Sequence, residues 1–168
     1  MNVARIELLI LDVDGVLTDG RLIMGSYGEP AKAFHAQDGC AIKLWQQCGG
    51  KAAILSGRPS EAVGRRAAEL GIEHVRTGVT DKLSAYVEIV SALGCTDTVV
   101  AYVGDDLPDI SPMRRCGLPI AVANAVPAIK QVSQYVTRRR GGEGAVAEVV
   151  EILLRKQARW SGALFGQV

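Results

Sequence analysis

Two aspartates at the end of a short apolar run are the residues in this sequence best suited to chemistry. Residues 8–11 (LLIL) are typical of a strand buried on both faces, and Asp12 and Asp14 follow directly. Gly15 then allows a tight backbone turn. Because carboxylates interrupt a buried strand, we expect the chain to surface here, at the sheet edge where α/β proteins bind ligands. The pattern indicates a metal ion and a nucleophile; Asp and Gly are also ordinary turn residues.

Polar residues follow two further predicted strands in the same way. Ser56 directly follows the predicted strand at residues 51–55. The apolar run at residues 98–103 leads through Gly104 to three acids: Asp105, Asp106 and Asp109. The carboxyl ends of parallel strands lie along one edge, so these clusters are expected to converge. Several carboxylates in one crevice cannot all remain ionised without a cation. Oxygen ligands without His or Cys favour Mg²⁺.

Such a site suits phosphoryl transfer. A carboxylate that attacks a phosphate dianion needs the joint negative charge offset by a metal ion, a lysine and hydrogen-bond donors. Ser56 and the backbone N–H groups around Gly57 are candidate donors, and Lys82 is the candidate ammonium. An acid beside the nucleophile would protonate the leaving alkoxide and then activate water. The alternatives are that Ser56 only caps the helix that follows and that Lys82 is an ordinary surface lysine.

The order of the predicted elements indicates an α/β fold. Strand and helix patterns alternate at short intervals, which predicts a Rossmann-like parallel sheet with right-handed crossovers and helices on both faces. Glycines between two short apolar stretches predict a small β-hairpin insert over residues 20–34. We expect one domain over residues 1–158, without a cap domain, and a C-terminal tail at 159–168. Residues 138–142 (RRRGG) are expected to form a basic, flexible link before the last helix.

The composition excludes several classes of protein. The 168 residues carry 19 basic and 18 acidic side chains, for a formal charge of +1, so no general nucleic-acid or membrane surface is indicated. The four cysteines lack the spacing of a zinc site or a disulfide framework, which favours reduced thiols. No apolar run reaches membrane-spanning length, and no signal peptide is evident. We therefore expect a cytoplasmic protein that binds neither nucleic acid nor membrane.

The motifs resemble those of a known superfamily. DVDG at 12–15, Ser56, Lys82 and GDDLPD at 104–109, in this order, resemble the four motifs of the haloacid dehalogenase superfamily. The resemblance implies that Asp12 is a nucleophile that forms a phospho-aspartate. It implies further that Asp14 is the general acid/base and that Ser56 and Lys82 bind the phosphoryl group. Mg²⁺ would be held by Asp12, the Asp14 carbonyl and Asp105, and supporting roles would fall to two further acids, Asp106 and Asp109.

Longer segments are similar to one branch of that superfamily. VDGVLTDG, FHAQDG, ILSGR and RGGEGAVAEV look like the capless branch that acts on 3-deoxy-D-manno-octulosonate 8-phosphate. The resemblance implies a homotetramer in which a neighbour's C-terminal segment closes the site, as a capless subunit needs a partner to exclude water. It implies a role in lipopolysaccharide biosynthesis. It also implies that three residues face the sugar acid: Asp38, Arg58 and Arg66.

Departures from the family pattern leave the substrate open. The family usually has a basic residue where Gln37 stands, a glycine at Ala41, and basic residues at Glu143 and Ala147. The alternative substrate is therefore another nonulosonate 9-phosphate, similar to a sialic acid phosphate. A receiver-like signalling module also combines acids, Ser/Thr, lysine and Mg²⁺. Such a module carries its adjacent acidic pair after the first strand, whereas the pair here comes late, at Asp105 and Asp106.

Overall fold

One parallel sheet organises the molecule. The computed structural model describes residues 3–24 and 31–160, and within them six strands pair in the order β3-β2-β1-β4-β5-β6. Their bounds are β1 Leu8–Leu11, β2 Lys51–Leu55, β3 His74–Arg76, β4 Val100–Gly104, β5 Leu118–Ala121 and β6 Tyr135–Val136. All five pairings are parallel. The order reverses at β1, which lies between β2 and β4, so the crevice at its carboxyl end is where such sheets bind ligands.

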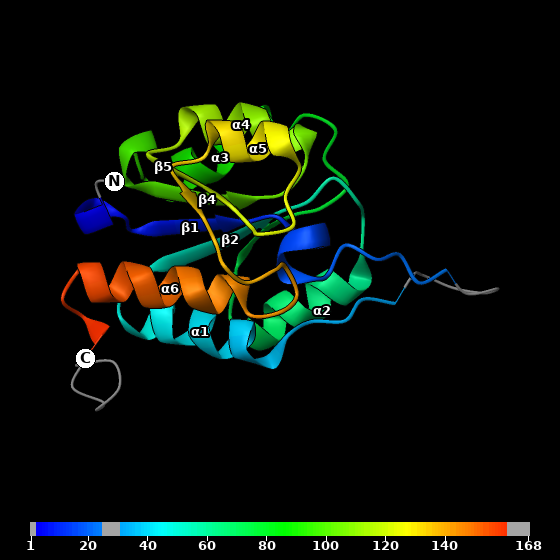
Figure 1. The fold of residues 1–168 in the computed structure, drawn as a ribbon, viewed down its shortest axis with the longest axis horizontal. Coiled ribbons are helices and arrows are strands. Elements are labelled where there is room, and N and C mark those ends of the chain that lie inside the picture. Colours follow the sequence, from blue (N-terminus) through cyan, green and yellow to red (C-terminus); the bar gives the residue numbers. More distant parts are fainter. Residues whose placement is uncertain (1–2, 25–30, 161–168) are drawn as a thin grey trace.

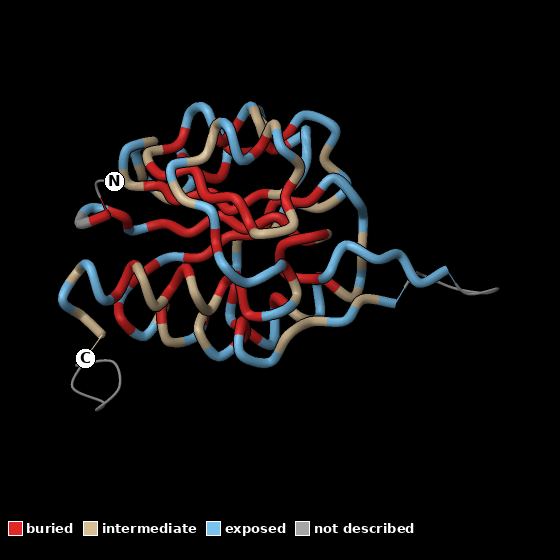
Figure 2. Tube along the Cα trace, in the orientation of Figure 1, coloured by how far each residue is buried: buried red, intermediate tan, exposed pale blue. Residues whose placement is uncertain are grey.

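Helices cover both faces of the sheet (Figure 1). Their bounds are α1 Ala36–Gln47, α2 Glu61–Leu70, α3 Lys82–Ala92, α4 Ile110–Arg115, α5 Pro127–Val132 and α6 Ala145–Lys156. One face carries α1, α2 and α6, and the other carries α3, α4 and α5 (Figure 1). Figure 2 shows the buried residues concentrated in the strands and on the inward sides of the helices. The predicted Rossmann-like architecture is confirmed, and no described segment forms a separate cap domain.

Local signals set most helix ends. The apolar stripe of α6 is buried throughout: Val146, Val149, Val150, Leu153 and Leu154. Ser60 caps α2 by accepting a hydrogen bond from the Val63 N–H, and Gly71 ends it in the left-handed conformation. The Asp81 carboxylate caps α3 by accepting hydrogen bonds from the Leu83 and Ser84 N–H groups.

The hairpin insert is described only in part. Ile23 and Ala31 form an isolated antiparallel bridge, as a hairpin requires, while its turn at residues 25–30 lies outside the described residues. Leu22, Ile23 and Met24 expose 41%, 57% and 74% of their surface, so this arm presents an apolar edge. The tail beyond Trp160 also lies outside the described residues. In the part of the chain that is described, no helix is both long and apolar enough to cross a bilayer.

The segment after β6 is fastened to the body of the protein. The backbone N–H groups of Arg138 and Arg139 donate to the Glu148 carboxylate, each at 2.9 Å, and the Gly142 N–H donates to the Val16 carbonyl at 3.0 Å. The prediction of a flexible link is therefore wrong. Its basic side chains suggested mobility, but its backbone N–H groups donate to Glu148, in the helix that follows, and to Val16, which is distant in the sequence.

Candidate active site

Three carboxylates from two strand ends converge on one acidic centre. Asp12 follows β1, and Asp105 and Asp109 follow β4; one carboxylate oxygen from each lies within 4.8 Å of the others. They line a pocket of about 340 Å³ at the carboxyl edge of the sheet. The pocket also contains most of the other residues expected from the sequence: Asp14, Ser56, Arg58, Lys82 and Asp106. The predicted convergence is confirmed.

Lys82 joins two of the acids. It is the first residue of α3, and only 7% of it is exposed. Its Nζ lies 2.8 Å from Asp12 Oδ1 and 2.7 Å from Asp109 Oδ1. The two ion pairs hold the ammonium at the base of the pocket, so Lys82 belongs to the site and is not an ordinary surface lysine.

Asp109 organises the loop after β4. Its Oδ1 accepts from the Tyr102 hydroxyl at 2.8 Å, and its Oδ2 accepts from the backbone N–H groups of Asp105 and Asp106 at 3.1 and 3.3 Å. Together with Lys82, these donors use both carboxylate oxygens. Asp106 caps the next turn through the Leu107 N–H at 2.8 Å. Asp109 and Asp106 therefore shape the loop that presents Asp105.

The acidic centre carries more negative charge than its own cation offsets. Burial raises the pKa of Asp105 to about 8, aided by the nearby charges of Asp12 and Asp109. Burial, with the Asp109 charge, raises the pKa of Asp12 to about 6, although Lys82 acts in the opposite direction. Burial alone would lower the pKa of Lys82, but its two carboxylate partners raise it overall. The ammonium therefore stays charged, and two of the acids resist ionisation.

The free oxygen of Asp105 fits a cation. Asp105 Oδ1 is buried and has no hydrogen-bond partner among the described residues. A buried, unpartnered carboxylate oxygen is costly unless a cation or water meets it. The neighbouring donors are carboxylate oxygens from Asp12 and Asp109, without His or Cys. This set suits a hard divalent ion such as Mg²⁺.

Gly15 lets the two acidic loops approach closely. Its φ of +93° is in the left-handed region, and a Cβ placed there would lie 2.0 Å from Asp105 Oδ2. Any other side chain would both strain the backbone and displace the Asp105 carboxylate. The glycine of the DVDG motif is therefore required by the contact between the ends of β1 and β4.

Asp14 is held by two cations at the mouth of the pocket. Lys32 Nζ contacts Asp14 Oδ1, and 6% of the Lys32 side chain is exposed. Arg58 Nε lies 3.7 Å from Asp14 Oδ2, and its side chain is 61% exposed. Lys32 was not predicted from the sequence, since a single lysine inside a predicted hairpin carries no local signal. Only the path of the hairpin arm back over the site reveals it.

Ser56 lies where its hydroxyl can meet a phosphoryl group. It directly follows β2, is 2% exposed, and lines the pocket beside Gly57. Its hydroxyl oxygen accepts from the Arg58 N–H at 3.4 Å, a contact within the same turn. The helix that follows is capped by Ser60, so the capping alternative for Ser56 does not hold.

Asp38 and Arg66 lie outside the acidic pocket. Asp38 is 1% exposed, and its Oδ1 accepts from the Ala147 N–H at 2.8 Å, which joins α1 to the first turn of α6. Arg66 pairs with Glu69 at 2.8 Å and lies over the Phe34 ring. Their assignment to the sugar acid stays a prediction.

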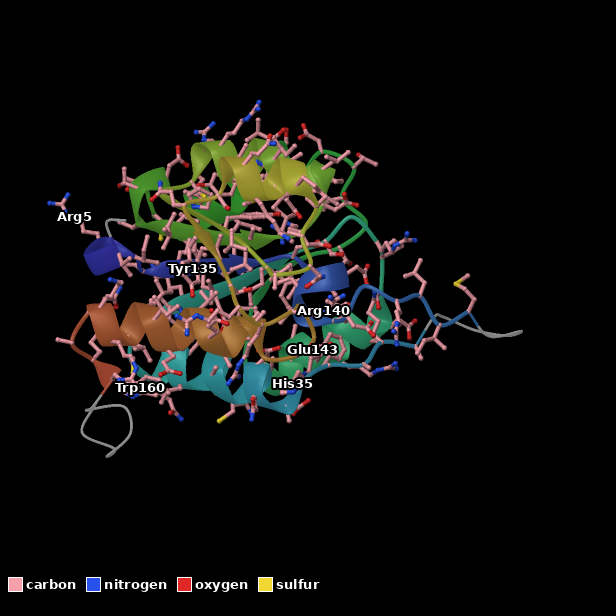
Figure 3. All side chains as sticks on the ribbon, viewed as in Figure 1. Arg5, His35, Tyr135, Arg140, Glu143 and Trp160 are labelled. Atoms are coloured by element: carbon pink, nitrogen blue, oxygen red, sulfur yellow. The ribbon has the colours of Figure 1, made fainter. Side chains whose placement is uncertain are left out.

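The positions that depart from the family pattern gather where α1 and α6 begin. Gln37 Oε1 accepts from Arg139 Nη1 at 3.2 Å. Glu143 Oε1 lies 4.0 Å from Arg140 Nε, and Figure 3 shows both residues beside the start of α6. The two acceptors thus face arginines of the fastened segment, so positive charge is present in this region through other residues.

Comparison with known proteins agrees with this geometry. A family model described as haloacid dehalogenase-like hydrolase matches residues 73–150. The 3-deoxy-D-manno-octulosonate 8-phosphate phosphatase KdsC of Yersinia pestis is 45% identical over 160 residues, 95% of this chain and 86% of the relative. The Escherichia coli K12 phosphatase of the same name is 46% identical over 155 residues, 92% of this chain and 82% of the relative.

A solved structure extends the match to the fold. The corresponding phosphatase from Moraxella catarrhalis, crystallised in complex with magnesium ion, phosphate ion and a KDO molecule, superposes with a TM-score of 0.95 at 42% identity. The match covers 99% of this chain and 95% of that one. Sequence, fold and the order of the site residues lead to one conclusion. The chain belongs to the haloacid dehalogenase-like hydrolases, in the family of the 3-deoxy-D-manno-octulosonate 8-phosphate phosphatases.

Proposed function

We propose that this protein is a Mg²⁺-dependent phosphatase that hydrolyses 3-deoxy-D-manno-octulosonate 8-phosphate to the free sugar acid and inorganic phosphate. The observation that carries the proposal is the convergence of carboxylate oxygens from Asp12, Asp105 and Asp109 within 4.8 Å, at the end of a pocket that also holds Ser56 and Lys82. The relatives that act on this substrate share nearly the whole chain.

The metal site is assigned to three groups. The carboxylates of Asp12 and Asp105 and the backbone carbonyl of Asp14 would hold Mg²⁺, with Asp109 and Asp106 keeping the Asp105 loop in place. When bound, the ion offsets the negative charge shared by the acids and the phosphoryl oxygens. The buried, unpartnered oxygen of Asp105 supports this assignment.

Asp12 acts as the nucleophile in the first half-reaction. One of its carboxylate oxygens attacks phosphorus while the bond from phosphorus to the sugar oxygen breaks. Asp14 donates a proton to that leaving oxygen, so the sugar acid leaves with a hydroxyl group in place of an alkoxide. Lys82 has a second partner in Asp109, which lets the ammonium turn toward the phosphoryl group without becoming unpaired. The product on the enzyme is a phospho-aspartate at Asp12.

Asp14 acts as the base in the second half-reaction. As a carboxylate it takes a proton from water, and the water oxygen attacks phosphorus. The bond between phosphorus and the Asp12 oxygen breaks, which releases inorganic phosphate and restores the carboxylate. Lys32 and Arg58 flank Asp14 and hold its side chain toward the pocket between the two steps.

The sugar acid would extend from the acidic centre toward the mouth of the pocket. Arg58 is the exposed cation there, and we assign it to the substrate's negative charge. Arg66 does not line the pocket of the acids, so it would reach substrate only in the site of a neighbouring subunit. The buried Asp38 would act on the sugar acid only indirectly, through its hydrogen bond to the start of α6. We therefore include a homotetramer in the proposal, supported by the exposed apolar arm at residues 22–24. A monomeric mass by light scattering would refute the assembly.

We further assign the enzyme to the cytoplasm and to lipopolysaccharide biosynthesis.

Replacing the nucleophile tests the reaction. Asp12→Asn should lower phosphate release from 3-deoxy-D-manno-octulosonate 8-phosphate by roughly 10³-fold or more, because the amide cannot form the phospho-enzyme. Circular dichroism should show the fold unchanged. Asp19→Asn is the matched control, since Asp19 is an exposed acid on the same loop that pairs only with Arg21 among the described contacts.

The same phosphate-release assay distinguishes the two candidate substrates. The rate measured on a nonulosonate 9-phosphate should be well below the rate on the octulosonate 8-phosphate. Substantial activity in Asp12→Asn would remove Asp12 as the nucleophile. A higher rate on the 9-phosphate would keep the chemistry and overturn the substrate assignment.

The raised pKa values predict a pH-dependent response to Mg²⁺. The pKa of Asp12 is raised to about 6 and that of Asp105 to about 8, above the ordinary value for aspartate. Groups with raised pKa values favour the folded state at low pH, and their contribution is lost as pH rises through these values. Without metal, the Tm should therefore fall between about pH 4 and pH 8, from the ordinary aspartate pKa to the raised value of Asp105. Mg²⁺ binding requires the ionised carboxylates, so the increase in Tm caused by excess Mg²⁺ should grow over the same pH range.

Calorimetric scans in chelator and in Mg²⁺ would measure both effects. Asp105→Asn removes the more strongly shifted group, and it should flatten the metal-free profile and reduce the gain from Mg²⁺. A metal-free Tm that does not change across this range would contradict the account of the acidic centre.

A further inference from the structure

We infer that Asn124 is a positioning residue for the metal site, because its side-chain amide joins the loop that carries Asp12 and Asp14 to the glycine turn before α6. The inference rests on the proposed function and extends it to a residue outside the four motifs. Asn124 lies in the loop between β5 and α5 and is partly buried. It does not line the acidic pocket.

Both ends of the Asn124 amide are used. Its Nδ2 donates to the Gly15 carbonyl at 3.2 Å, and its Oδ1 accepts from the Gly141 N–H at 2.7 Å. These partners are 109 and 17 residues away along the chain. To bridge the Gly15 carbonyl and the Gly141 N–H, a side chain must offer one donor and one acceptor. The asparagine amide has the donor and the acceptor at fixed positions and at the length that this gap requires.

The joined segments are in direct backbone contact. A Cβ at Gly141 would lie 1.7 Å from the Gly15 carbonyl oxygen, and one at Gly142 would lie 2.4 Å from the Asp19 nitrogen. The Gly142 N–H also donates to the Val16 carbonyl at 3.0 Å. The glycine turn therefore rests on the nucleophile loop over several residues. Asn124 fixes this contact at Gly15, which follows Asp14 and lies against the Asp105 carboxylate.

The same loop also holds the other acid-bearing segment. Val126 lies two residues after Asn124, and its backbone N–H donates to the Asp105 carbonyl at 2.9 Å. Gly15 in turn lies against the Asp105 carboxylate. Residues 124–126 thus fasten the end of β1 and the end of β4 to one another. Mg²⁺ demands near-ideal octahedral geometry with bonds of about 2.0–2.1 Å, so a small shift of Gly15 relative to Asp105 would weaken binding.

Removing the amide should weaken metal binding before it harms the fold. Asn124→Ala should lower the affinity for Mg²⁺, measured by titration calorimetry on the substrate-free protein, by roughly 10–100-fold, as for other groups that orient metal ligands. In saturating Mg²⁺, most of the kcat should return and the KM for substrate should change little. Asn124→Ser retains a polar group in the loop but is too short to bridge both partners. It should show the same loss and tests the inference if the alanine variant does not fold.

Lys130→Met is the matched control. Lys130 Nζ donates to the Ala123 carbonyl at 2.7 Å, so it fastens the same loop without touching Gly15 or Gly141. Its Mg²⁺ affinity should equal that of the parent. Parental affinity in both Asn124 variants, or an equal loss in Lys130→Met, would overturn the inference. Failure of the proposed function would be seen in the parent protein itself, as an absence of both Mg²⁺ binding and sugar phosphatase activity.

Discussion

The structure depends on an unbalanced negative charge among largely buried carboxylates at the base of a pocket. Three carboxylates meet at the end of β1 and β4, and Lys82 supplies a single buried ammonium between two of them. Burial keeps the acids from ionising freely, and one oxygen of Asp105 is left without a partner. In the proposed mechanism a divalent cation would offset this charge and leave one oxygen of Asp12 free to act as the nucleophile. The carboxylates thus provide a site for a divalent cation, and a cation bound there would offset their negative charge.

The fold provides this arrangement through backbone contacts as much as through side chains. Because β1 lies between β2 and β4, the loops after these three strands emerge side by side. Gly15 removes the side chain that would keep the Asp12 and Asp105 loops apart. The turn at Gly141 and Gly142 packs on the loop that carries Asp12 and Asp14. A capless subunit lacks a covering domain, so its site precision relies on these close contacts.

Much of the site was predictable because its signals are local in the sequence. Asp12, Ser56 and Asp105 each follow an apolar run, and a parallel sheet brings such positions to one edge without further information. Lys82 was predictable from the order of motifs, although its burial was not. The buried residues of α6 recur at helical spacing, a pattern from which a buried face can be predicted directly.

What the sequence did not predict depends on contacts between distant segments. Lys32 reaches Asp14 only because the hairpin arm folds back over the site, and Asn124 meets Gly15 across 109 residues. The basic segment before α6 was expected to be flexible, because composition does not show that Glu148 accepts its N–H groups. Asp38 was assigned by resemblance alone, and its contact with the Ala147 N–H is a structural one within the subunit.

A crystal structure of the protein with Mg²⁺ would test the central claim most directly. The account predicts one octahedral ion with oxygens of both Asp12 and Asp105 at about 2.0–2.1 Å, and Lys82 still paired with Asp109. An ion bound by Asp105 alone, with Asp12 too distant to share it, would contradict the account and with it the phospho-aspartate chemistry.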